Sequence, residues 1–278
     1  MKKILLLFSL IIFTACGNQD NLITSEVSIV SLSPPVTEVL IDLGLSDYII
    51  GVDMFSAGIE GLAEGIAVFD LIFPDMEALI LADPSLIFTS IWESTDPNNP
   101  FAEVLRSSMV YIPTANSFSE IVRQIAYIGE ITGTSEAALA ITEEFEERVN
   151  ALAAASERTP VYVYFEIDIM PDLFTFGSGV FLNDVLEMLG ATNIFRDLEG
   201  WAAVSAEQVI YANPDIILTN INFLDDPIGE IINRPGFAAI DAVRNGKVFY
   251  IDTDSSSRAN HNIIYAIEQI AEKLEAVN

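Results

Sequence analysis

The sequence contains one cysteine and one histidine, and each scarcity removes a class of site. Because Cys16 has no second cysteine to pair with, an internal disulfide is excluded, and the core alone must hold the fold. Because His261 stands alone, the imidazole-rich sites that bind bare zinc or manganese are not expected either. We interpret His261 as a residue at the N-terminus of a helix.

Catalytic signatures are also missing from the chain. It contains no G-x-S-x-G elbow, no P-loop and no G-x-G-x-x-G motif. A Ser-His-Asp site would have to use His261, and no matched nucleophile lies near it in the sequence. We therefore expect a protein that is not an enzyme, with no catalytic residue, no metal ligand and no resident cofactor.

Basic residues are few, because 12 Lys and Arg face 41 Asp and Glu, for a net charge of −29. A surface of this sign repels phosphate backbones, which excludes nucleic acid as a partner. Two interpretations of the acids remain open. They form a solvated surface adapted to salt, or some of them contact a basic partner.

Long apolar runs are limited to one segment near the start. Lys2 and Lys3 precede the run Ile4–Phe13, which is far shorter than the ~20 residues of a membrane span. This arrangement resembles a bacterial lipoprotein signal that ends at Cys16, and the resemblance implies a lipid on the cysteine sulfur. Residues 17–26 would then be a flexible leash. We expect an exported, lipid-anchored protein facing the periplasm or the cell exterior, with an ordinary secretory signal as the alternative.

One stretch of sequence occurs twice. Glu77–Ser90 reads EALILADPSLIFTS, and Glu207–Asn220 reads EQVIYANPDIILTN, with no gap in the alignment. Each copy predicts the end of an amphipathic helix, a stop at proline and a buried strand. A second pair, VLIDLG at Val39–Gly44 and VLEMLG at Val185–Gly190, supports the first. Repetition once per half indicates two similar α/β lobes.

The predicted fold class is α/β, with two Rossmann-like lobes of mainly parallel sheet joined by a single long α-helix. We place the first lobe at residues 27–133, the connecting helix at 134–158 and the second lobe at 159–278. The main part of the connecting segment, about Ser135–Ser156, is rich in strong helix formers and would be about 33 Å long. Because a helix is stiffer than a loop, we do not expect large hinge motion.

Loops at the carboxyl ends of parallel strands are where α/β folds bind ligands. On that edge we expect the turn Ser33–Pro35, the loop Asp53–Ser56, the strand end Thr89–Trp92 and the loop Asp252–His261. Asp172–Gly179 is a further predicted loop, and we place Trp201 in a loop before the helix-capping Ser205. The strands themselves are expected at Val27–Leu32, Tyr48–Val52, Leu86–Phe88, Met109–Ile112, Val161–Phe165, Ile216–Leu218 and Lys247–Ile251.

Several motifs together resemble one protein family. They read IVSLSPPVTEVLIDLG, YIIGVD, FPDMEALILADPSLIF, FTFGSGVFLNDVLEMLGATNIF, WAAVSAEQVIYANPDIIL, NRPGFAAIDAVRNGKVFYID and SRAN. From about Val27 to the C-terminus the chain is similar to the iron-siderophore and vitamin B12 periplasmic-binding proteins, the substrate-binding components of ABC importers. The resemblance implies a monomer that holds a small-molecule metal chelate between its lobes and delivers it to a permease dimer with its ATPase.

The resemblance also implies roles for individual residues. Glu77 and Glu207, which open the two copies of the repeat, match the acids that dock into arginine pockets of the permease. Their other interpretation is a favourable charge in the first turn of a helix. The expected ligand contacts are strand-end and loop residues of both lobes: Ser33, Pro34, Phe55, Trp92, Phe176, Trp201, Asp254, Ser255, Ser256, Ser257 and Arg258.

The ligand is constrained by the shortage of arginine. Only Arg258 is placed to meet a negative group, so a low-charge ferric hydroxamate is favoured over a tricatecholate. Vitamin B12 is an alternative, although Ser255 stands where the vitamin B12-binding members carry a Trp. Haem is another, with a Tyr or His261 as axial ligand. An enzyme or metallochaperone on the same two-lobed frame is the alternative from another class.

Overall fold

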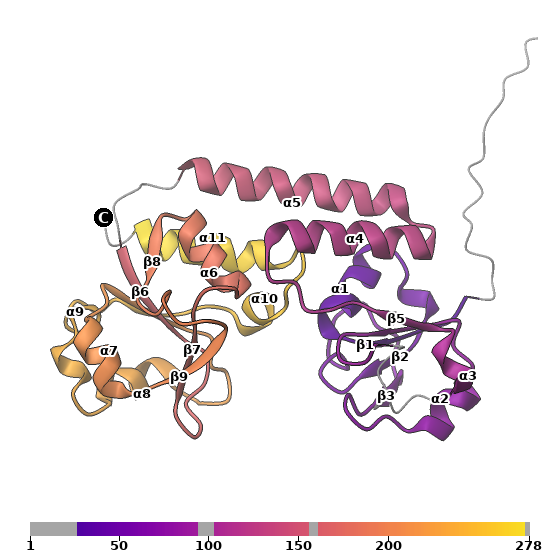
Figure 1. The fold of residues 1–278 in the computed structure, drawn as a ribbon, viewed down its shortest axis with the longest axis horizontal. Coiled ribbons are helices and arrows are strands. Elements are labelled where there is room, and N and C mark those ends of the chain that lie inside the picture. The colour runs from indigo at the N-terminus through magenta and orange to yellow at the C-terminus, as the bar shows by residue number, and fades with distance from the viewer. Residues whose placement is uncertain (1–26, 94–102, 156–160, 276–278) are drawn as a thin grey trace, which may run out of the picture.

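The computed structural model describes residues 27–93, 103–155 and 161–275. The predicted signal, its Cys16 and the leash lie outside the described residues, as do the last residues of the predicted connecting helix. Figure 1 shows two α/β bodies side by side, with the helix α5 (Ser135–Ala155) running along one side of both. The predicted fold class is confirmed, with a parallel sheet in each body.

The first body is built on a five-stranded parallel sheet with the order β3-β2-β1-β4-β5. Its strands are Ile29–Leu32 (β1), Ile49–Asp53 (β2), Ala67–Phe69 (β3), Leu86–Thr89 (β4) and Met109–Tyr111 (β5). Every residue of β1 is buried because this strand pairs with both β2 and β4. Because all five strands run parallel, their carboxyl ends meet at one edge of the sheet.

Short helices surround this sheet. They are α1 (Pro34–Asp42), a 3₁₀ turn at Ser46–Tyr48, α2 (Met76–Ala82) and α3 (Glu103–Arg106). The helix α1 begins directly after β1 because Pro34 and Pro35 occupy its first turn, where no backbone N–H is needed. Its inner face buries Val36, Val39 and Leu40 against the sheet. The loop between β1 and α1 is thereby fixed at the sheet edge.

The second body has a four-stranded parallel sheet with the order β11-β10-β6-β8. Its strands are Val161–Glu166 (β6), Ala191–Asn193 (β8), Ile216–Thr219 (β10) and Val248–Tyr250 (β11). Its helices are α6 (Phe181–Met188), α7 (Ala206–Ala212), α8 (Pro227–Asn233), α9 (Asp241–Arg244), α10 (Thr253–Ser257) and α11 (Ile263–Glu275), with a 3₁₀ turn at Phe237–Ala239.

Three loop predictions of the second body are wrong, because the segments 172–179 and 252–261 contain regular structure and Trp201 begins a strand. The segment 172–179 contains β7 (Leu173–Phe176), which pairs antiparallel with β9 (Trp201–Val204). This pairing joins segments separated by α6 and β8, so no local pattern marks it. The segment 252–261 contains α10, which Asp252 caps by accepting a hydrogen bond from the backbone N–H of Ser255 at 2.8 Å.

The repeated stretch forms the same unit in both bodies. In each copy a seven-residue helix, α2 or α7, leads into a strand, β4 or β10, beside the first strand of its sheet. The helices end at Asp83 and Asn213, whose φ angles of 46° and 48° are left-handed. Pro84 and Pro214 follow, and the prolines prevent the helices from continuing.

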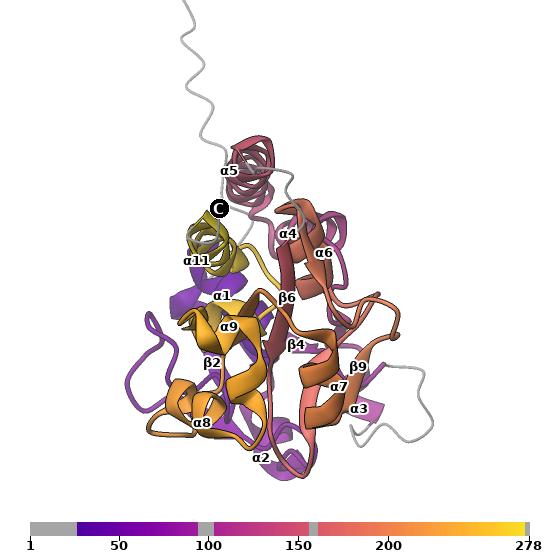
Figure 2. The ribbon, with the colours of Figure 1, turned by 90° about the vertical axis from the view of Figure 1, so that its left-hand side faces the viewer.

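The connection between the bodies is a helical hairpin. The helix α4 (Phe118–Thr132) ends at Gly133, whose φ of 73° reverses the chain into α5. A Cβ on Gly129 would lie 2.4 Å from the Cβ of Ala138, so glycine is what lets the two helices approach this closely. Figure 2 shows α5 end-on, lying over α4 and α11. The helix predicted at 134–158 is therefore α5 as far as Ala155.

One apolar cluster extends through both bodies. It includes Leu40 of α1, Ile125 of α4, Phe145 of α5, Leu186 of α6 and Ile267 of α11, all buried. The two sheets thus rest on a shared layer of helices. Among the described residues, no helix combines the length and apolarity that crossing a bilayer requires.

Candidate functional site

A pocket of about 410 Å³ is lined by residues of both bodies. Its volume falls within the ~300–1,000 Å³ range of small-molecule sites. Ser33 follows β1, Phe55 follows β2 and Ser90 follows β4, so the first body contributes the carboxyl edge of its sheet. Of the predicted ligand contacts, the ones that line this pocket are Ser33, Pro34, Phe55, Asp254, Ser257 and Arg258.

The loop that presents Phe55 is held by Asp53, a buried carboxylate that was not among the predicted site residues. Its Oδ1 accepts hydrogen bonds from the backbone N–H groups of Phe55 at 2.8 Å and Ser56 at 3.2 Å. These bonds fix a turn at the end of β2 and leave the Phe55 ring 62% exposed. An Asp at the end of a predicted strand, followed by a turn, was the available signal.

The guanidinium of Arg258 is already paired with two carboxylates. It donates to Glu38 of α1 and, at 2.9 Å, to Oδ1 of Asp254. Glu38 and Arg258 are both largely buried, with side chains 13% and 16% exposed. The positive charge of Arg258, which was predicted to meet a ligand group, is therefore offset within the protein.

Glu38 is also the centre of a joint between the two bodies. Asn260 Nδ2 donates to Glu38 Oε2 at 2.7 Å and to the carbonyl oxygen of Pro35 at 3.0 Å. One turn further along α1, Asp42 Oδ2 lies 2.9 Å from Nε2 of His261. The segment 258–262 is thus bonded side by side to α1.

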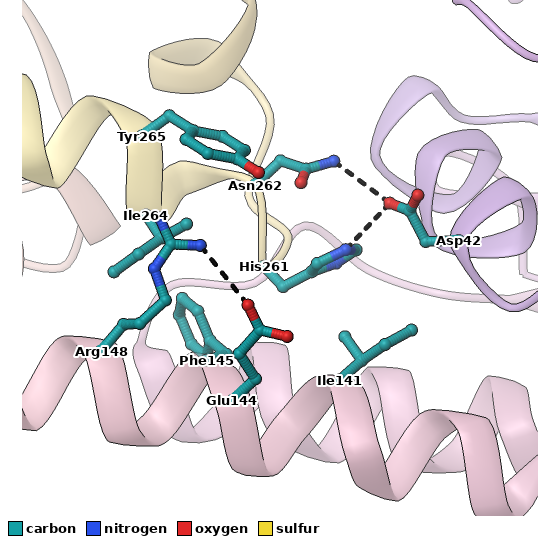
Figure 3. A pocket seen from close by; sticks show the side chains of 9 residues that line it. All are labelled: Asp42, Ile141, Glu144, Phe145, Arg148, His261, Asn262, Ile264 and Tyr265. Atoms are coloured by element: carbon teal, nitrogen blue, oxygen red, sulfur yellow. Dashed lines mark hydrogen bonds and ion pairs between the residues drawn. The ribbon is translucent and has the colours of Figure 1, made fainter.

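A smaller pocket of about 230 Å³ lies behind this joint (Figure 3). Asp42, His261 and Asn262 line one side, and Glu144 and Arg148 of α5 line the other. His261 lies two residues before α11, and its Nδ1 is buried without a hydrogen-bond partner among the described residues. His261 therefore belongs to the contact between the two bodies, through its bond to Asp42, and it lies near the helix N-terminus where it was predicted.

Trp201 and Phe176 form an aromatic pair on the ribbon of β7 and β9. Their ring centroids are 6.0 Å apart at 82°, an edge-on contact. Trp201 is half exposed, whereas Phe176 is fully buried and also contacts Phe165 at 5.6 Å. Phe176 therefore has no surface free for a ligand, and its effect is to support the Trp201 ring.

The serine run of α10 is largely occupied by its own hydrogen bonds. Ser255 Oγ donates to Asp252 Oδ1 at 2.7 Å, and Ser256 Oγ donates to the carbonyl oxygen of Asp252 at 2.6 Å. Asn220 Nδ2 reaches Ser256 Oγ at 3.0 Å and Ser257 Oγ at 3.2 Å. Ser255 and Ser256 thus shape the pocket wall from behind, and Ser257 lines it.

Trp92 lies away from the pocket described above. It is partly buried against the apolar cluster of Leu32, Phe69 and Leu79. Its backbone N–H lies 3.3 Å from Oγ1 of Thr89, which holds the turn after β4. Its indole Nε1 is buried without a partner among the described residues. The structure thus places Trp92 in a side cluster of the first body.

A buried ion cluster under the edge of the second sheet was not predicted. Glu166 ends β6, is fully buried, and accepts from Arg234 in a two-pronged pair at 2.6 and 2.9 Å. Glu230 also binds Arg234, and Tyr164 donates its hydroxyl to Glu166 at 3.0 Å. Burial, reinforced by the Glu166 charge, raises the pKa of Tyr164. Burial opposes the charge of Arg234, but the Glu166 and Glu230 carboxylates outweigh it and raise its pKa.

Glu77 and Glu207 are exposed in the first turns of α2 and α7. Figure 1 shows these helices in different bodies but on the same side of the molecule, away from α5. Hydrogen bonds from its own backbone N–H and from Ser205 lower the pKa of Glu207, so its carboxylate is charged at neutral pH. The two acids therefore face solvent rather than the pocket.

Two parallel-sheet bodies that share a pocket, formed by strand ends of the first and by α10 and residues 258–259 of the second, define a two-lobed binding protein. A family model described as periplasmic binding protein matches residues 29–255. The chain belongs to this family of periplasmic binding proteins. The family is one of substrate-binding proteins of transport rather than of enzymes.

Individual relatives agree with this assignment. The chain is 27% identical over 269 residues to the uncharacterized ABC transporter substrate-binding lipoprotein YvrC of Bacillus subtilis, covering 93% of this chain and 83% of the relative. It is 24% identical to the vitamin B12-binding protein of Vibrio cholerae, covering 89% and 88%. A solved structure of a possible iron-binding periplasmic protein from Staphylococcus epidermidis superposes with a TM-score of 0.75 at 30% identity, covering 89% and 98%.

Proposed function

We propose that this chain captures a metal chelate, with a ferric siderophore favoured, between its lobes and delivers it to an ABC permease with its ATPase. The observation that carries the proposal is the pocket of about 410 Å³ lined from both lobes at the carboxyl ends of the first sheet. A ligand held there would touch both lobes at once. No chemical change of the ligand is needed for this role.

The charge of the site favours a chelate of low net charge. The charged side chains that line the described pocket are Asp254 and Arg258, and they pair with each other at 2.9 Å. Glu38 adds a further negative charge beside Arg258. A tricatecholate would meet no free cation there, whereas a hydroxamate chelate would not need one.

The exposed ring of Phe55, which lines the pocket, favours a ligand with a broad apolar face. The half-exposed ring of Trp201 does not line this pocket, so Trp201 would contact only a ligand that extends beyond it. The Phe55 ring also supports a corrinoid as the second candidate, in line with the name of the Vibrio cholerae relative. Haem would need an axial ligand, and the pocket described here is lined by neither a Tyr nor a His. Contact of Trp92, Ser255, Ser256 and Phe176 with a ligand would require rearrangement, so we assign them supporting roles.

The test measures quenching of tryptophan fluorescence by a ferric trihydroxamate, a ferric tricatecholate, cyanocobalamin and haemin. We expect the trihydroxamate to bind at least about tenfold more tightly than the tricatecholate, a difference of ~1.4 kcal/mol. The absorption spectrum and native mass of protein purified from its host identify the natural ligand independently. Binding of free iron or zinc ions in preference to every chelate, or turnover of the bound chelate, would contradict the proposal.

Delivery is proposed to use Glu77 and Glu207, one exposed acid on each lobe, against basic pockets of the two permease subunits. Cys16 would carry the lipid that keeps the protein near the membrane. Replacing both acids by alanine should abolish import and leave chelate binding intact. If chelate binding is lost as well, the acids serve the fold or the pocket and the docking role fails.

A further inference from the structure

Leu81 and Tyr211 are large apolar side chains that are almost fully exposed. Leu81 on α2 is 85% exposed, and Tyr211 on α7 is 93% exposed. They occupy the same position in the two copies of the repeat. One exposed leucine on a protein surface needs no explanation, but the same repeat position exposing a large apolar group in both lobes does. Packing in the core does not account for either residue.

Each of these side chains lies on the same helix face as a docking acid. Leu81 is four residues after Glu77, and Tyr211 is four residues after Glu207. Residues at this spacing are neighbours on a helix surface, about 5–6 Å apart at their Cβ atoms. Both helices lie on the side of the molecule away from α5 in two perpendicular views (Figures 1 and 2). Each lobe therefore carries one exposed carboxylate and one exposed apolar group at neighbouring positions of a helix on this side of the molecule.

We propose that Leu81 and Tyr211 are the apolar anchors of the contact with the ABC permease, one on each lobe beside its docking acid. The inference rests on the proposed function. On each subunit, the permease surface would carry an apolar pocket next to a basic group that pairs with Glu77 or Glu207. A basic partner surface also suits a chain with a net charge of −29.

At an interface, a charged group and an apolar group act on different rate constants, which is the physical reason for pairing them. Charged groups speed association and set orientation, and their effect falls with salt. Buried apolar and aromatic groups slow dissociation, because they must be exposed to water again when the partners separate. An exposed acid alone would give a fast and weak encounter, and the neighbouring side chain adds residence time.

The experiment measures binding of the full mature protein to the permease–ATPase complex of the same organism in lipid nanodiscs. We expect Leu81→Ser and Tyr211→Ser each to weaken binding at least about fivefold, mainly through faster dissociation. Matched controls are Leu139→Ser on α5 and Tyr127→Ser on α4, which replace residues 57% and 47% exposed. These controls should bind like the unchanged protein. Circular dichroism melting should show every variant folded, since no replaced side chain is buried.

Several outcomes overturn the inference. If Glu77→Ala and Glu207→Ala lose binding while Leu81→Ser and Tyr211→Ser keep it, the anchors fail and the proposed function stands. If the glutamate variants also bind normally, docking through this side of the molecule fails altogether. The permease contact is also contradicted if the control variants lose binding to the same extent, or if binding falls equally on nanodiscs without permease. A dimer of the unchanged protein that Leu81→Ser dissociates would instead assign these residues to contact between copies of the chain.

Discussion

The two lobes carry matching acids in the helix that leads into each VLxxLG segment, and the surroundings of these acids are opposite. Glu38 of α1 and Asp184 of α6 precede the matched segments VLIDLG and VLEMLG. Glu38 is paired with Arg258 across the lobe boundary. Asp184 borders a groove of about 630 Å³ between α4, α5 and α6, near Glu187 and Glu120. Duplicated positions have thus diverged, so that one fastens the lobes together and the other faces like charges.

The polar groups buried beneath the two sheet edges differ in the same way. The first lobe relies on hydroxyl groups and one acid, with Thr37 Oγ1 donating to Ser31 Oγ at 2.8 Å and Asp53 holding the next loop. The second lobe buries the ion pair of Glu166 and Arg234. A buried ion pair is costly to break from one side, because the remaining charge is stranded.

The largest expected effect comes from breaking that ion pair. Glu166→Ala should lower the free energy of unfolding by about 3–5 kcal/mol, because Arg234 loses its two-pronged partner. Urea denaturation measures the change. The double variant Glu166→Leu with Arg234→Met should recover most of the loss, since no fully buried charge is then stranded and Glu230, with its side chain 37% exposed, can be solvated. A loss below about 1 kcal/mol in the single variant would show that the cluster is solvated.

The next effect concerns the joint between the lobes. Glu38→Gln should cost about 1.5–3 kcal/mol of unfolding free energy, because Arg258 and Asn260 lose a charged acceptor. Denaturant titration measures this, with Glu60→Gln on the exposed surface as a control that should change little. An equal change in the control would remove the special role of Glu38.

A smaller effect separates the helix ends of the two repeats. Asp83→Gly should stabilise the fold by up to about 1 kcal/mol, because glycine adopts a left-handed φ without strain. Asn213→Gly should bring no gain, since Asn213 exchanges two hydrogen bonds of 2.8 Å with Asp241. Thermal unfolding of both variants checks the contrast. Equal gains in the two would mean that the Asn213 bonds contribute nothing.

The smallest effect tests Asp184, because this carboxylate remains partly solvated. Burial, with Glu187 and Glu120, raises its pKa above the ordinary value of 3.8. The folded chain then holds the proton more tightly than the unfolded chain, so ionisation lowers stability as pH rises through this window. Asp184→Asn should therefore stabilise slightly at pH 7 and make no difference below pH 3.8. Stability curves at both pH values decide, and a loss at pH 7 would contradict the expectation.

Both sheets could be predicted from the sequence because their inner strands are continuous apolar runs. The repeat also marks one strand in each sheet, β4 in the first and β10 in the second. The short edge strands β3 and β8 and the ribbon of β7 and β9 could not be predicted. The strand β3 reads AVF with two exposed residues, and β8 reads ATN, so neither shows an apolar run. The edge strands β5 and β11 are equally short but were predicted, because they read MVY and VFY. The ribbon depends on a partner beyond α6. Local periodicity carries no information about such pairings.

The pocket shows the same limit. Phe55 and Arg258 were predicted from the family resemblance, in loops expected at the ligand-facing edge, and they do line the pocket. Their partners were not predicted, since Arg258 and Glu38 are 220 residues apart and no spacing rule connects them. The burial of aromatic side chains could not be predicted either. Phe176 and Trp201 are both aromatic residues near strand ends, yet Phe176 is in the core and Trp201 is half exposed.

The apolar cluster that extends through both lobes has a thermodynamic consequence. Leu40, Phe145, Leu186 and Ile267 belong to separate elements of one shared layer, so neither lobe can lose its packing without exposing the surface of the other. The chain should therefore melt as one cooperative unit, with calorimetric and van't Hoff enthalpies in agreement, although it holds two separate parallel sheets.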